Sequence, residues 1–149
     1  MRFLGNLESK TDAKGRVFLP SVFRKELMAS GEESLVMCKD VHKRCLVLYP
    51  QSAWNRRMDE MFAKADEWDE QEADALRMFM SDVELLSLDG NGRLLIPRRY
   101  VEFACISQAV RFIGMNDRIE LWAPEGLAAA TLSKEQFADK LKTIMSRQL

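Results

Sequence analysis

The sequence is poor in the residues that most catalytic and metal sites require. It has a single histidine, His42, with no Ser–His–Asp arrangement and no glycine-rich loop of the kind that cradles phosphates. His42 lies between Cys38 and Cys45, but a structural zinc ion takes four ligands and this spacing is not that of a zinc finger. We therefore expect no enzyme, no metal site and no cofactor.

Long apolar runs are also missing. No stretch approaches the roughly 18–20 residues that a membrane-spanning helix needs, and the first ten residues, MRFLGNLESK, have no apolar core of signal-peptide length. The cysteines number three, which is odd, and they are widely spaced, as is common in a reducing compartment. We expect a cytoplasmic protein without a membrane partner.

A strong net charge is the third absence, since the formal charge is only -1. The distribution is uneven, however. Residues 1–27 hold six basic and three acidic side chains, whereas residues 59–74 hold eight acidic side chains and one lysine. On charge alone two interpretations stay open: a polyanion-binding face in the first segment, or two ordinary solvated surfaces.

What the sequence does contain is a repeated motif. TDAKGRVFLP at residues 11–20 returns as LDGNGRLLIP at residues 88–97, and both read Asp-x-x-Gly-Arg, three apolar residues and Pro. The aspartate suits a turn, the glycine accepts a positive φ, and the proline suits the first turn of a helix. The residues that we interpret as backbone devices are Asp12, Gly15, Pro20, Asp89, Gly92 and Pro97.

The order of elements around the motif repeats as well: strand, turn, strand, short helix and hairpin. In the first copy we expect a strand over 2–8, a helix with Val22, Phe23 and Leu27 on one face and a stop at Gly31, then a hairpin of SLVMCK and CLVLYP. The second copy has VELLSL, RLLI, PRRYVEFA, AVRFIG and RIELWAP. The alignment matches Asp40 with Asp117, then slips by three so that Pro50 matches Pro124.

Helices are predicted outside the two copies. Between them, Ser52 is a candidate cap, Trp54, Met58, Met61 and Ala65 form an apolar stripe, and a break near ADEWDE precedes a second helix to about Met80. At the carboxyl end, Ser133 and Gln136 form a capping pattern before an apolar face of Phe137, Leu141 and Ile144. The predicted boundaries are 1–52 and 81–127 for the repeats, 53–80 for the acidic linker and 128–149 for the last helix.

Neither repeat is large enough to fold alone, because about 45 residues with several strand edges bury too little apolar surface. Two copies complete each other if their hairpins interleave around a pseudo-twofold axis. The sequence therefore predicts an α+β fold in which the duplication supplies the symmetric partner within one chain.

At DAKGRVFLPSVFR and DGNGRLLIPRRYV the sequence resembles the SpoVT/AbrB-like swapped-hairpin superfamily, and the tandem copies with an acidic helical linker resemble its MraZ family. The resemblance implies a duplicated swapped-hairpin β-barrel with short helices, a helical linker and a C-terminal helix. It also implies a bacterial, nucleoid-associated transcriptional regulator of the division and cell-wall gene cluster. Such a regulator binds double-stranded DNA at short G-rich promoter repeats as a ring-shaped homo-oligomer.

The resemblance implicates Asp12 with Arg16, and Asp89 with Arg93. Arginine can hold a guanine edge or a phosphate through two parallel hydrogen bonds, and an aspartate four residues away can hold it in place. From the residues alone, an ion pair that only stabilises the turn is an open alternative. The full set of candidate DNA contacts is Lys10, Lys14, Arg16, Arg24, Arg93, Arg98 and Arg99. The second copy has Val101 and Asn91 where the first has Arg24 and Lys14, so we expect the first copy to be the stronger contact.

A second function also stays open. The acidic linker DEMFAKADEWDEQEAD is a candidate docking surface for a basic partner protein, or a mimic of nucleic acid. The apolar hairpin strands are candidates for subunit contacts, although apolar strands of this kind more often form the core.

Overall fold

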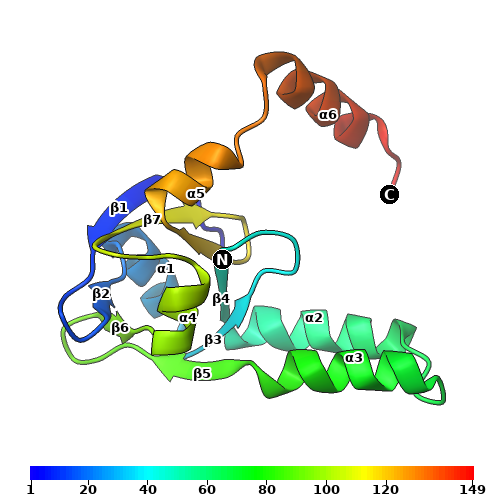
Figure 1. Cartoon of the computed structure of the whole chain (residues 1–149), viewed down its shortest axis with the longest axis horizontal. Coiled ribbons are helices and arrows are strands. Elements are labelled where there is room, and N and C mark those ends of the chain that lie inside the picture. Colours follow the sequence, from blue (N-terminus) through cyan, green and yellow to red (C-terminus); the bar gives the residue numbers. More distant parts are fainter.

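Strands of the two repeats interleave in a six-stranded antiparallel sheet in the computed structural model, which describes residues 1–149 (Figure 1). The order across the sheet is β1 (Asn6–Lys10), β7 (Ala109–Gly114), β8 (Ile119–Trp122), β4 (Leu46–Pro50), β3 (Ser34–Lys39) and β5 (Glu84–Ser87). The first strand of each repeat pairs with the hairpin of the other, β1 with β7 and β5 with β3. The predicted α+β class is therefore confirmed, and one sheet contains strands of both repeats.

A second, two-stranded sheet joins the motifs. β2 (Arg16–Phe18) pairs with β6 (Arg93–Leu95), with Val17 opposite Leu94 at its centre. Val17 and Leu94 point into the core and are almost fully buried, together with Phe23, Leu48 and Phe112. The larger core cluster therefore draws on both repeats.

Short helices follow both prolines, as predicted. α1 (Ser21–Ser30) ends at Gly31, whose φ of 73° provides the left-handed cap, and α4 (Arg98–Phe103) follows Pro97. The predicted apolar face of α1 is partly wrong. Phe23 and Leu27 are buried, but Val22 is half exposed, because a residue adjacent to Phe23 lies about 100° around the helix from it.

The structure relates the residues of the two hairpins by a different offset from that of the sequence alignment. Leu35 and Met37 are the core positions of β3, and their counterparts in β7 are Val110 and Phe112. The second repeat is thus two residues shorter before its hairpin, because α4 is shorter than α1. Matching Asp40 with Asp117 was wrong for this reason.

The linker forms two helices, α2 (Gln51–Lys64) and α3 (Glu70–Ser81), separated at the predicted break. Ser52 does not cap α2, which begins after Pro50; its N–H and hydroxyl instead donate to Glu32. Trp54 packs between Tyr49 and Phe79 on the outer face of β3 and β4.

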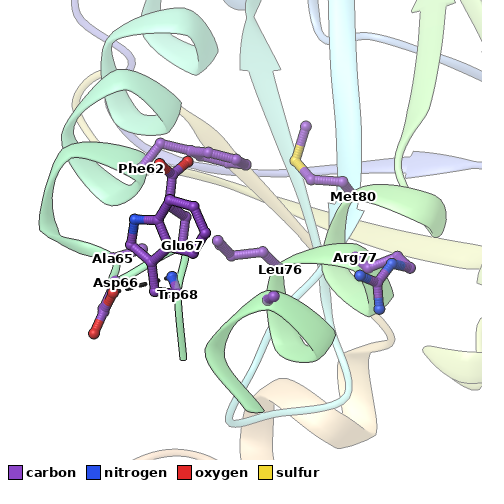
Figure 2. A pocket seen from close by; sticks show the side chains of 9 residues that line it. Phe62, Ala65, Asp66, Glu67, Trp68, Leu76, Arg77 and Met80 are labelled. Atoms are coloured by element: carbon purple, nitrogen blue, oxygen red, sulfur yellow. Dashed lines mark hydrogen bonds between the residues drawn. The ribbon is translucent and has the colours of Figure 1, made fainter. Parts of the chain in front are cut away.

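Burial along the predicted linker stripe decreases toward the hairpin tip, where Met58, Met61 and Ala65 are only partly buried. Phe62 and Trp68 near the tip, together with Leu76 and Met80 farther along α3, border an open cavity of about 660 Å³ (Figure 2).

The chain ends with α5 (Pro124–Ala129) and α6 (Lys134–Ser146). The predicted capping pattern is confirmed, since the Ser133 hydroxyl accepts from the Gln136 N–H and the Gln136 side chain accepts from the Ser133 N–H. Figure 1 shows α6 standing away from the sheets. None of the helices combines the length and apolar character that crossing a membrane requires.

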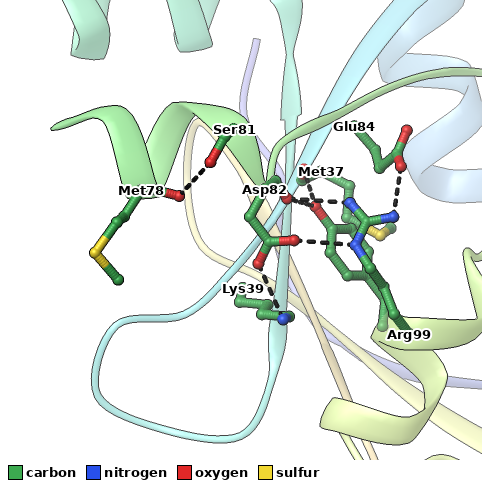
Figure 3. Close-up of polar contacts among 8 residues, drawn as sticks. Met37, Lys39, Met78, Ser81, Asp82, Glu84 and Arg99 are labelled. Carbon is green, nitrogen blue, oxygen red and sulfur yellow. Dashed lines mark hydrogen bonds and ion pairs between the residues drawn. The ribbon is translucent and has the colours of Figure 1, made fainter. Parts of the chain in front are cut away.

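A polar network joins the repeats where α3 meets β5 (Figure 3). The Asp82 carboxylate contacts Lys39 Nζ at 2.9 Å and Arg99 Nε at 3.0 Å, and Arg99 also pairs with Glu84 at 2.6 Å. These contacts lower the pKa of Asp82, with the hydrogen bond from Lys39 as the main cause, and raise that of Arg99. Beside them the buried Tyr100 hydroxyl lies between the carbonyl oxygens of Met37, at 3.0 Å, and Asp82.

We expect Tyr100→Phe to lower the free energy of unfolding by about 1–3 kcal/mol, because it removes the hydroxyl that donates to the carbonyl oxygens of Met37 and Asp82 at a buried position. Tyr49→Phe is the matched control, since the Tyr49 hydroxyl makes no hydrogen bond within the chain, and it should cost far less. Urea denaturation followed by tryptophan fluorescence measures both. Equal costs for the two variants would contradict the role given to the Tyr100 hydroxyl.

Candidate nucleic-acid interface

The two Asp-x-x-Gly-Arg segments form the same turn. In the first, Asp12 Oδ1 accepts from the N–H groups of Lys14 at 2.9 Å and Arg16 at 3.0 Å, and Oδ2 accepts from Arg16 Nε at 2.7 Å. In the second, Asp89 accepts from Asn91 and Arg93 at 2.9 Å each, and from Arg93 Nε at 2.8 Å. One carboxylate thus closes the turn and holds the arginine in both copies.

The hydrogen bonds favour the ionised carboxylates. The N–H of Arg16 is the main cause that holds the pKa of Asp12 below its usual value, followed by the Arg16 side chain and the Lys14 N–H. The pKa of Asp89 is lowered in the same way, first by the N–H of Arg93. Both turns are therefore held by a full negative charge at neutral pH.

The ion pairs leave most of each guanidinium available. Arg16 and Arg93 are bound through Nε, and their terminal nitrogens make no hydrogen bond within the chain. The side chains are 33% and 22% exposed. Each arginine is therefore oriented by its aspartate and still presents N–H groups that can donate to a guanine or a phosphate.

Both arginines lie on the outer face of the two-stranded sheet. Successive side chains of a strand point to opposite faces, so the burial of Val17 and Leu94 places Arg16, Phe18, Arg93 and Leu95 on the other side. Phe18 and Leu95 are half exposed there, and the Arg93 guanidinium lies 5.8 Å from the Phe18 ring centre. The sequence prediction missed Phe18 and Leu95, although strand alternation with the arginines indicates them.

Backbone hydrogen bonds clamp each turn to the opposite repeat. The N–H of Leu19 donates to the carbonyl oxygen of Gly92, and the N–H of Ile96 donates to that of Gly15, both at 3.1 Å. The glycines have φ angles of 84° and 80°, as the turn requires. The two turns therefore have a fixed relation to one another across the pseudo-twofold axis.

The other predicted DNA contacts lie in different surroundings. Lys10, Lys14 and Arg98 are exposed, and Lys14 and Arg98 border one cavity of about 650 Å³ between the first turn and α4. Arg98 makes only a 3.4 Å contact with Glu102. Arg99 belongs to the Asp82 network described above.

Arg24 reaches across to the second turn. Its Nε is buried without a partner, and its side chain lies so close to Gly92 that an added Cβ would come within 2.6 Å of it. Val101 occupies the matching position of the second repeat and borders the open cavity beside the first turn. The two turns have the same backbone conformation, but a side chain packs against the second turn and an open cavity lies beside the first.

Comparison with known proteins agrees with this duplication. The sequence model of the family described as "MraZ protein, putative antitoxin-like" matches residues 2–79 and again residues 78–147. The chain belongs to the MraZ family. A protein of Phocaeicola vulgatus named transcriptional regulator MraZ is 52% identical over 97% of this chain and 94% of its own length. Proteins of the same name from Bacteroides thetaiotaomicron and Bacteroides fragilis are 46% and 45% identical over 98% and 99% of this chain, and over 94% of their own lengths.

The unequal support of the two MraZ turns predicts unequal costs of Gly15→Ala and Gly92→Ala. Each change strains a positive φ by about 1–2 kcal/mol, but only Gly92→Ala also displaces Arg24. Thermal or urea unfolding should show the larger loss for Gly92→Ala. In an Arg24→Ala background the two losses should converge, and a difference that persists there would contradict the contact.

A second prediction concerns the Asp12 carboxyl. Its pKa in the folded protein should lie below the ordinary value of about 3.9, so the stability that it contributes is present above pH 4 and is lost as the pH falls through the folded pKa. Carboxyl-detected NMR titration measures this pKa. In Arg16→Gln the pKa should rise only in part, because the backbone donors remain, and a complete return to the ordinary value would contradict their leading role.

Proposed function

We propose that this chain is a sequence-specific DNA-binding transcriptional regulator. The observation that carries the proposal is the pair of arginines that are held by Nε, keep their terminal nitrogens unpaired, and lie on one face of a two-stranded sheet. The names of its relatives, transcriptional regulator MraZ, support the same conclusion. The function is one of binding, with no catalytic step.

A two-stranded β-ribbon fits the major groove of B-DNA, where guanine presents O6 and N7 as acceptors. Arg16 and Arg93 would make bidentate contacts with guanine, as the G-rich repeats implied by the family resemblance require. Lys10, Lys14 and Arg98 would bind phosphates and so position the ribbon. Asp12 and Asp89 orient the arginines without touching DNA.

We assign two of the predicted DNA contacts, Arg24 and Arg99, mainly to structural roles. Arg24 lies behind the second turn, and we assign it mainly to the support of that turn, with any phosphate contact made by its terminal nitrogens. Arg99 is held by Asp82 and Glu84, so we leave it out of the proposed interface. The first turn, with Lys14 at its tip, is the stronger contact.

The finer proposals follow the family resemblance. The chain would form the swapped-hairpin barrel, assemble into a homo-oligomeric ring in the cytoplasm, and act at the nucleoid on short promoter repeats of the division and cell-wall gene cluster. A few base contacts per subunit bind weakly. Several subunits on neighbouring repeats gain by effective concentration, by factors of about 100 to 10,000.

The test is a titration of this protein into a labelled DNA fragment from upstream of its gene, with binding followed by fluorescence anisotropy. Arg16→Ala should weaken binding at least tenfold, because a bidentate contact is worth roughly 1–3 kcal/mol. Arg16→Lys should weaken it nearly as much, because lysine keeps the charge but loses the Nε tether and the fork. Arg56→Ala, an exposed arginine of α2 without an ion pair, should bind as the unchanged chain does.

Binding should also fall steeply with rising salt, as phosphate contacts require. Circular dichroism and light scattering should show that the Arg16 variants keep their fold and assembly. An Arg16→Ala protein that is folded, assembled and still bound to the fragment with unchanged affinity would refute the proposed interface.

A further inference from the structure

The last helix has an apolar face that nothing covers. All residues from 131 to 149 are exposed, and Phe137, Leu141 and Ile144 on one side of α6 are 50%, 40% and 57% exposed. Together with Leu132 they border a shallow apolar groove along the helix. An isolated helix of 13 residues is only marginally stable in water, so α6 needs a surface on which to pack.

The sheet of its own repeat does not offer that surface. In the first repeat, Val36 and Val47 form the outer face on which the linker helices pack. The matching positions of the second repeat are Arg111 and Glu120, which are engaged with Asn6 and with the Trp122 indole. Two charged side chains thus occupy positions that are apolar in the first repeat, and Figure 1 shows α6 standing away from the sheets.

A complementary surface runs along the α2–α3 hairpin from its tip. Figure 2 shows the side chains of Phe62, Trp68, Leu76 and Met80 around the cavity between the two helices. Trp68 is 90% exposed and Phe62 47% exposed. This hairpin and α6 project from different parts of the chain and lie apart from each other in Figure 1.

The opposite charges of the hairpin and of α6 favour their pairing as well. Residues 59–74 at the hairpin tip hold eight acidic side chains and one lysine, whereas residues 133–149 hold four basic and two acidic side chains. Lys140 borders the apolar groove of α6, and Asp66 and Glu67 border the hairpin cavity. The pairing of α6 with a second α6 would instead bring like charges together.

We propose that α6 of one copy of this chain packs its apolar face into the α2–α3 hairpin of a second copy. Each copy then donates one helix and accepts another, so the contact is head-to-tail and builds a ring when its rotation closes. The inference rests on the proposed homo-oligomer and names the surfaces that would join its subunits.

Two exposed-site variants test the pairing without disturbing the core: Leu141→Asp on α6, and Phe62→Asp combined with Trp68→Asp on the hairpin. Each protein alone should lose assembly and approach the 17.2 kDa mass of one chain in light scattering. Met78→Asp, at a residue of α3 that is exposed but outside the cavity, is the matched control and should assemble normally.

Mixing the two variants distinguishes this contact from the alternatives. A head-to-tail interface leaves one intact junction in the mixture, so the mixed sample should form dimers of twice the single-chain mass and nothing larger. Normal assembly of the hairpin variant alone, or failure of the mixture to pair, would overturn the proposal; the first result would point to contact between α6 helices.

The outcome of the DNA-binding experiment is independent of the outcome of the assembly experiment. A chain that assembles without α6 but loses DNA binding in Arg16→Ala refutes only the present inference. A chain that assembles through α6 but binds the promoter fragment regardless of Arg16 refutes only the DNA interface. An unchanged chain that is monomeric at all concentrations refutes the present inference together with the proposed ring.

Discussion

The carboxylate that opens each Asp-x-x-Gly-Arg turn is the interaction on which the rest of the structure depends. It accepts two backbone N–H groups and one arginine Nε, and so closes the turn, orders the strand that follows and aims the arginine in one step. The same turn presents the glycine carbonyl that receives the N–H from the opposite repeat. Without the carboxylate, the central two-stranded sheet would lose the geometry that relates its two ends.

Duplication within one chain allows the two halves to diverge, which a symmetric dimer of identical subunits cannot do. Arg24 supports the second turn, while its counterpart Val101 leaves a cavity beside the first. Val36 and Val47 belong to an outer face that the linker helices cover, while the charged side chains of Arg111 and Glu120 stand at the matching positions of the second repeat. The pseudo-twofold core is thus common to both halves, and their differences lie on the surface, where partners would bind.

Much of this was predictable from the sequence because its signals are local. Turn chemistry, proline at helix starts and alternation in the hairpins depend on neighbouring residues, and the repetition doubles each signal. The failures have long-range causes. Ser52 is not a cap because α2 already begins at Gln51, so Ser52 lies in the first turn, where its N–H and hydroxyl donate to the carboxylate of Glu32, twenty residues earlier in the chain. The shift between the hairpins follows from the different lengths of α1 and α4, and the contact of Arg24 with Gly92 crosses between repeats.

On the proposed function, the two arginines would contribute in different ways. An arginine loses roughly 2 kcal/mol of side-chain rotational freedom when it is fixed, and the Nε tether removes part of that loss before DNA arrives. Arg93 is restrained further by the Phe18 ring, and Arg24 stiffens its turn. Arg16 is more exposed, beside a turn with Lys14 and an unfilled cavity. The second turn is therefore the more preorganised of the two, and the first combines the higher positive charge with room to adjust to the groove.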